Sequence, residues 1–255
     1  MAHGLLGFDD AVDRGTVTAS SQVLSLPAIN VQHPFLSPKV WRSVGNTESL
    51  TCDFTTDRFI DVVALLACNF TSGATWRIRL DSDSGFATPH TYDSGTVATG
   101  IDLTYKACIH VLPSRVTARY LRVDITDTGS SFLQVGRWVA MRAWRMTRNF
   151  AWGTRERWAD LSRQTVAESG QIWVDRGPNY RVVSITNNAI TDAETHSDLQ
   201  HLGRTARARD VLFVSDPASG NLGRDSIFGL LEAPPEPRQE GLNRHSMALT
   251  IVERL

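Results

Sequence analysis

Apolar and polar residues alternate through much of the first 145 residues. In residues 74–80 the apolar side chains fall on one side of an extended chain, and threonine and arginine fall on the other. Residues 119–125 repeat this pattern, with Leu121, Val123 and Ile125 at the apolar positions. A period of two is typical of a strand with one buried face. We therefore predict that these three side chains are buried in a β-sheet.

The region around these strands predicts a sandwich of short strands. Residues 59–68 form a nearly continuous apolar run, which favours a central strand covered on both faces, with a short buried helix as the alternative. Further strands are predicted at residues 22–26, 50–54, 106–112 and 132–146. Turn-forming residues separate them, at 81–85 and 127–129 among other places. Six to eight short strands without a helical pattern indicate a β-sandwich or jelly roll.

The pattern changes after residue 146. Residues 145–163 are rich in arginine and tryptophan and have weak periodicity, so we interpret them as a linker or docking segment. Residues 171–175 and 180–186 then predict a hairpin that reverses at 176–179. A helix follows, with Thr191 as its N-cap, Glu194 reaching back to it and Gly203 near its end.

The helix has few apolar residues, so we expect it on the outside of a sheet. Strands at 211–214, 227–231 and 247–252 would complete that second sheet, and residues 233–238 read as a loop. The predicted fold is mainly β, an N-terminal jelly-roll β-sandwich plus a smaller C-terminal β domain that carries one surface helix. The predicted divisions are an N-terminal arm (1–20), the jelly roll (21–146), an Arg/Trp-rich linker (147–170) and the second β domain (171–255).

Composition narrows the environment and the partners. The net charge of −1 argues against nucleic acid as a partner. No window approaches 18 apolar residues, so we expect no membrane insertion. The three cysteines lack CxxC spacing, which predicts buried, reduced thiols. The acidic N-terminus lacks the pattern of a signal peptide, so we expect synthesis in a cytoplasm without secretion.

Arginine supplies 24 of the 26 basic residues, since Lys39 and Lys106 are the lysines. A GC-rich genome is the simpler explanation of this bias. The other is a set of packed polar interfaces, in which the planar guanidinium group is favoured.

No motif for catalysis is present, so we predict no enzyme, no catalytic residues and no cofactor. The chain lacks GxSxG, P-loop and HExxH patterns. His196 and His201 would lie about 140° apart around a helix, which disfavours a shared metal ion. Asp81, Asp83 and Asp93 read as turn formers, although a carboxylate pair for glycoside hydrolysis or calcium ligands are the other readings.

The aromatic residues are the best candidates for function. Trp152 and Trp158 lie in the Arg-rich segment beside Arg148 and Arg155, and we predict that these four residues form an interface, either between the domains or with another subunit. The alternative is that the two tryptophans cap the bottom of the first sandwich while the arginines are solvated.

Two other sets of aromatic residues receive different predictions. We expect Trp76, Trp138 and Trp144 in the core, because each falls in a strand pattern. Residues 86–92 form a candidate exposed glycan-binding loop that contains His90 and Tyr92, and the alternative for this segment is a simple connection.

Several strand sequences occur in a familiar order. Val40-Trp-Arg-Ser precedes Leu50-Thr-Cys-Asp-Phe, and Ile60-Asp-Val-Val-Ala-Leu and Ala74-Thr-Trp-Arg-Ile-Arg-Leu follow. Ala118-Arg-Tyr-Leu-Arg-Val-Asp-Ile then leads to Leu133-Gln-Val-Gly-Arg-Trp. Over residues 20–146 this order resembles the galactose-binding-like (discoidin-type) jelly roll, and especially the version in minor tail proteins of long-tailed bacteriophages.

This resemblance implies a non-enzymatic structural component of a phage tail, at the tail tip, the baseplate or the fibre attachment. The implied partners are other tail proteins in a symmetric oligomer, and the implied location is the virion. Members of the wider family often bind glycans or calcium, so a module that recognises a cell-surface glycan is the second hypothesis. A glycan hydrolase or esterase is the third.

Overall fold

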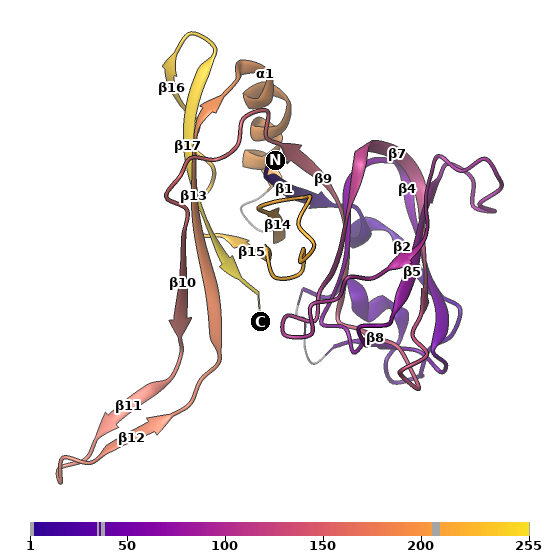
Figure 1. The fold of residues 1–255 in the computed structure, drawn as a ribbon, viewed down its shortest axis with the longest axis horizontal. Coiled ribbons are helices and arrows are strands. Elements are labelled where there is room, and N and C mark those ends of the chain that lie inside the picture. Colours follow the sequence, from indigo (N-terminus) through magenta and orange to yellow (C-terminus); the bar gives the residue numbers. More distant parts are fainter. Residues whose placement is uncertain (1–2, 35, 37–38, 206–209, 255) are drawn as a thin grey trace.

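The computed structural model describes residues 3–34, 36, 39–205 and 210–254. The protein is mainly β, as predicted, and has two lobes (Figure 1). The first lobe is a β-sandwich, and the second carries the helix and several long strands. One antiparallel sheet runs through both lobes, with the strand order β10-β13-β17-β15-β14-β1-β9-β4-β7-β5-β6. In addition, β2 pairs with β4 and β16 with β17.

The strands of the sandwich lobe, together with the strand that joins the lobes, are β1 (Leu5–Asp10), β2 (Thr16–Ala19), β3 (Trp41–Arg42), β4 (Thr47–Leu66), β5 (Thr75–Asp81), β6 (Tyr92–Ala98), β7 (Cys108–Thr126), β8 (Gln134–Val135) and β9 (Arg137–Arg145). The strands of the second lobe are β10 (Arg155–Asp160), β11 (Arg163–Val166), β12 (Ile172–Asp175), β13 (Asn179–Ile190), β14 (Asp210–Val214), β15 (Ser226–Leu231), β16 (Arg238–Gly241) and β17 (Arg244–Glu253). The helical elements are η1 (Val12–Arg14), η2 (Ala28–Gln32), α1 (Asp192–Glu194), the π turn η3 (Thr195–Leu199) and α2 (Gln200–Thr205).

Two long bent strands, β4 and β7, build the sandwich. Their pairing is interrupted between Asp53 and Arg58, so each strand takes part in both layers. The predicted alternation is confirmed, because Leu121, Val123 and Ile125 are fully buried in the core between the layers. The apolar run at 59–68 is a central strand, as predicted, since the second half of β4 pairs with both β7 and β9.

Strand β1 joins the two lobes. It pairs with β9 of the sandwich on one side and with β14 of the second lobe on the other. Leu5, Leu6 and Phe8 are almost fully buried. The prediction of an N-terminal arm is therefore wrong for these residues. A strand that is buried on both faces shows no alternation, and an apolar run as short as residues 5–8 does not distinguish such a strand from other structures.

The second lobe packs its helix against one face of its strands. Leu199 and Leu202 of the helix join Ile185, Leu249 and Ile251 of the sheet in one apolar cluster. The predicted cap is confirmed, because Thr191 and Glu194 form a reciprocal capping box. The helix continues through Gly203 to Thr205, two residues beyond its predicted end. The strands predicted near 211–214, 227–231 and 247–252 are confirmed as β14, β15 and β17.

The predicted hairpin around residues 176–179 is wrong. Strand β12 pairs with β11, and β13 pairs with β10 and β17, so the chain continues in one direction past Gly177-Pro178. The reversal lies instead at residues 167–170, where Gly170 has a φ of +80°. Glycine adopts that conformation without strain. The predicted strand at 22–26 is likewise wrong, since it holds only an isolated bridge between Val23 and Leu26.

Two further features concern the chemistry of the chain. Cys52, Cys68 and Cys108 are free and buried, as predicted. Within the described ranges, no helix has both the length and the apolar character needed to cross a membrane.

Candidate functional site: a projecting ribbon and the pockets at its base

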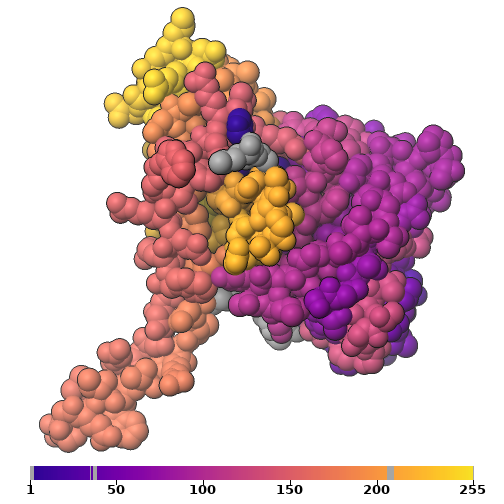
Figure 2. Space-filling model, viewed as in Figure 1, coloured from indigo at the N-terminus to yellow at the C-terminus, as the bar shows by residue number. Residues whose placement is uncertain are grey.

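A two-stranded ribbon projects from the second lobe. We define the ribbon as residues 155–182, in which β10 pairs with β13 and β11 pairs with β12. Figure 2 shows its outer part standing clear of the rest of the molecule. Every residue of β11 and β12 is exposed. Among the described residues, β11 and β12 pair only with each other.

Apolar side chains occupy both faces of the outer ribbon. Val166 lies opposite Ile172 on one face, and Val174 lies two residues further along that face. Trp173 lies on the other face, opposite Thr165. Trp173 is 62% exposed and Val166 is 66% exposed. Such contiguous exposed apolar surface is typical of an interaction site.

The structure places the four predicted interface residues in or next to the ribbon. Trp158 and Arg155 belong to β10, and Trp158 lies opposite Arg181 of β13. Trp152 and Arg148 lie in the connection from β9 to β10. Trp152 is fully exposed and Trp158 is 58% exposed, so neither ring caps the sandwich core. Trp173 was not among the predicted interface residues, although it lies within three consecutive apolar residues, 172–174, which are a signal for apolar surface.

The candidate glycan loop has its aromatic rings turned inward. Phe86 is buried, and the Tyr92 hydroxyl lies 2.6 Å from Nε2 of His110. The His90 side chain is 6% exposed, with Nδ1 3.2 Å from a carboxylate oxygen of Asp81. The exposed tip consists of residues 87–89, none of which is aromatic. His90 and Tyr92 thus stabilise the loop from within, and the tip offers no flat surface for a sugar.

Of the three aspartates near this loop, Asp81 and Asp93 are hydrogen-bonded to neighbouring residues and Asp83 is exposed to solvent. Asp93 accepts hydrogen bonds from Arg77, and this lowers the pKa of Asp93 to about 2. Burial raises the pKa of Asp81, but hydrogen bonds from His90 and from two backbone amides outweigh it and lower the pKa overall. Asp83 is exposed in the turn. In the described part of the chain, no group of three or more His, Cys, Asp or Glu side chains is placed to hold a metal ion.

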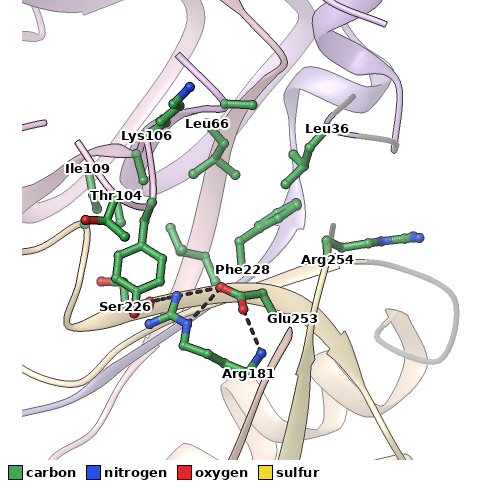
Figure 3. A pocket seen from close by; sticks show the side chains of 15 residues that line it. Leu36, Leu66, Thr104, Lys106, Ile109, Arg181, Ser226, Phe228, Glu253 and Arg254 are labelled. Carbon is green, nitrogen blue, oxygen red and sulfur yellow. Dashed lines mark hydrogen bonds and ion pairs between the residues drawn. The ribbon is translucent and has the colours of Figure 1, made fainter. Parts of the chain in front are cut away.

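A cavity of about 190 Å³ lies where the base of the ribbon meets the sandwich lobe (Figure 3). Its floor is the ion pair between Arg181 and Glu253, with N–O distances of 2.7 and 2.9 Å. The Arg181 guanidinium also lies 4.0 Å from the ring centre of Tyr105. The side chain of Lys106 points away from the cavity, and so does that of Arg254. The walls are mostly apolar.

A second pocket, of about 260 Å³, lies against the opposite face of β14 and β15. The register shows this, because Leu212 and Phe228 line the first cavity as a cross-strand pair while Phe213 and Ile227 line the second pocket as the next pair. Three residues line both pockets. They are Tyr105, Arg181 and Ser226.

Comparison with known proteins gives no family assignment. No protein-family model matches the chain, and no curated protein matches it either.

Solved structures with a partly similar fold include carbohydrate-binding modules. Chitosan-binding module 1 of a chitosanase/glucanase from Paenibacillus sp. IK-5 is 19% identical, with a TM-score of 0.43, and the match covers 53% of this chain and 100% of that one. The family 32 module of NanJ from C. perfringens, solved with galactose, is 12% identical, with a TM-score of 0.43 and coverages of 54% and 99%. The family 32 module of AlyQ, in complex with 4,5-unsaturated mannuronic acid, is 21% identical, with a TM-score of 0.40 and coverages of 53% and 98%. At these values the likeness assigns no ligand to this chain.

Proposed function

We propose that the chain is a non-enzymatic structural component that binds protein partners through its ribbon. The observation that carries this proposal is the outer ribbon itself, which has two strands and exposes apolar side chains on both faces. An isolated two-stranded ribbon is at best marginally stable in water. A partner that covers Trp173 and the Val166–Ile172 pair would stabilise the ladder and remove apolar surface from water.

The finer proposal is a component of a bacteriophage tail, at the tip, the baseplate or the fibre attachment. It is supported by the order of strand sequences in residues 20–146 that resembles minor tail proteins. In this proposal the chain is made in the host cytoplasm and acts in the virion, within a symmetric oligomer and beside other tail proteins. Symmetric closure would repeat one ribbon contact around the assembly.

Removing the ribbon's two large rings should weaken assembly without unfolding the protein. We expect Trp158→Ala/Trp173→Ala to self-associate roughly thirtyfold more weakly, because truncation of a central aromatic anchor typically costs about 2 kcal/mol or more in binding. Both rings are more than half exposed, so the melting temperature should hold. Sedimentation velocity over a concentration series measures this association.

Leu103→Ala provides the matched control, since Leu103 is 60% exposed but lies in the sandwich lobe. It should associate like the wild type. Identical association curves for all three proteins would contradict the role of the ribbon.

Glycan binding is the second candidate function. The pockets at the base of the ribbon favour it, because they combine aromatic rings with polar side chains at an open surface. The glycan would be a cell-surface one. Galactose, which is named with one of the similar structures, is a reasonable first probe.

A further inference from the structure

We propose that the second pocket at the base of the ribbon binds one uncharged sugar ring. This inference rests on the second candidate function and gives it a place in the molecule away from the loops of the sandwich. The pocket is bounded by Tyr105 of the sandwich lobe, by Glu156 of β10, and by Phe150, Phe213 and Ser226.

The size and floor of the pocket suit a six-membered ring. Its volume of about 260 Å³ exceeds the roughly 150 Å³ of a cavity that accepts benzene, which leaves room for ring substituents. Phe150 is half-buried and packs edge-on against Phe213, with ring centres 5.6 Å apart. The apolar C–H face of a sugar stacks on such a ring.

Glu156 supplies the polar group on the same face as this apolar floor. It lies opposite Val183 in the β10–β13 ladder, and Val183 shares one apolar cluster with Phe213 and Ile227. The Ser226 side chain alternates with Ile227, so it lies on the face of the first cavity, and its Oγ is fully buried there. The polar contact in the second pocket therefore falls to Glu156.

The charges around the pocket favour a neutral polyol over an ion. Arg181 is neutralised by Glu253, and Arg224 is paired with Asp225. Glu156 is exposed, and its carboxylate has no hydrogen bond or ion pair with another described residue. Its carboxylate can accept hydrogen bonds from sugar hydroxyls, but it would repel an anionic ligand. A single free carboxylate is too little to retain a metal ion.

The site can be tested by saturation-transfer NMR and titration with three probes: D-galactose, D-mannose and N-acetyl-D-glucosamine. The variants are Glu156→Gln, Phe150→Leu and the double variant, with His90→Ala as a control in the sandwich loop. We expect the wild type to bind at least one probe, each single variant to bind it about tenfold more weakly, and His90→Ala to bind it like the wild type.

Phe150→Leu keeps an apolar side chain against Phe213 but removes the flat ring. Melting curves of the sugar-free variants check that weaker binding does not reflect lost stability. Sedimentation of the same variants measures assembly separately from sugar binding.

Two results would overturn the proposal. One is that no probe binds the wild type, which would remove the sugar site but leave the assembly function standing. The other is binding that survives the double variant and disappears in His90→Ala, which would move the sugar to the sandwich loop.

Discussion

Replacing Arg137 by methionine is expected to lower the free energy of unfolding by about 3–5 kcal/mol. Arg137 is 1% exposed, and its guanidinium donates hydrogen bonds to Asp10, to Asp13 and to the carbonyl of Gln32. These contacts connect the first residue of β9 to the end of β1 and to the two short helical turns that follow it, η1 and η2. Methionine fills similar space, but it leaves the Asp10 carboxyl group buried without its cation.

The loss should depend on pH. Burial raises the pKa of Asp10 to about 7, while Arg137 acts in the opposite direction. The folded wild type and the folded variant both hold the Asp10 proton below about pH 7, but without Arg137 the pKa of Asp10 rises further. The additional pH-dependent penalty of the variant is therefore small below about pH 7 and grows as the pH rises above it. Urea unfolding at several pH values measures it.

The double variant Asp10→Asn/Arg137→Met is the matched control, because it removes the buried charge together with its partner. It should be more stable than Arg137→Met at pH 7, and its stability should depend less on pH. If Arg137→Met unfolds like the wild type at pH 7, the cluster contributes nothing to the junction between the lobes.

The second large effect is expected at Glu194. Its carboxylate is buried and accepts hydrogen bonds from Nε1 of Trp144, from the backbone amides of Thr147 and Thr191, and from the Thr191 hydroxyl. Glu194→Ala should lower the free energy of unfolding by about 2–4 kcal/mol, because it removes half of the capping box and leaves the buried Nε1–H of Trp144 without its acceptor. Chemical unfolding at pH 7 checks this value.

Glu194 also predicts a sensitivity to acid. Burial raises the pKa of Glu194, but the four hydrogen bonds outweigh it and the pKa is lowered from 4.5. Its contribution to stability is therefore fully present above pH 4.5 and is lost as the pH falls through the lowered pKa. Glu194→Gln should remove this part of the acid dependence. An equal loss of stability in acid for this variant and the wild type would contradict the assignment.

Local signals in the sequence predicted much of the fold. Alternation placed Leu121, Val123 and Ile125 correctly, because a strand with one polar face repeats every two residues. Thr191 and Glu194 predicted the start of the helix, since the reciprocal cap needs only residues three apart. The wider role of Glu194 was not predictable, because Trp144 lies fifty residues earlier in the chain.

The remaining features depend on contacts between distant segments. Strand β1 finds its partners near residues 141–145 and 212–214, and no local pattern shows this. The ribbon looked like a linker because its strands are exposed on both faces. Phe150, Glu156 and Phe213 reach one pocket from separate segments, so their spacing in the sequence carries no signal. The partner of the ribbon could not be predicted either, because it depends on the other proteins of the assembly and not on this chain alone.

Hydrogen–deuterium exchange of the ribbon amides tests the central claim most directly. In dilute solution the amides of β11 and β12 should exchange rapidly, because their ladder is two strands wide and open to water on both faces. At concentrations where the protein assembles, the account predicts exchange at least ~10-fold slower in residues 163–175, with no change in β7 of the sandwich core. Equally rapid exchange of the ribbon in the assembled state, with protection appearing elsewhere on the surface, would contradict it.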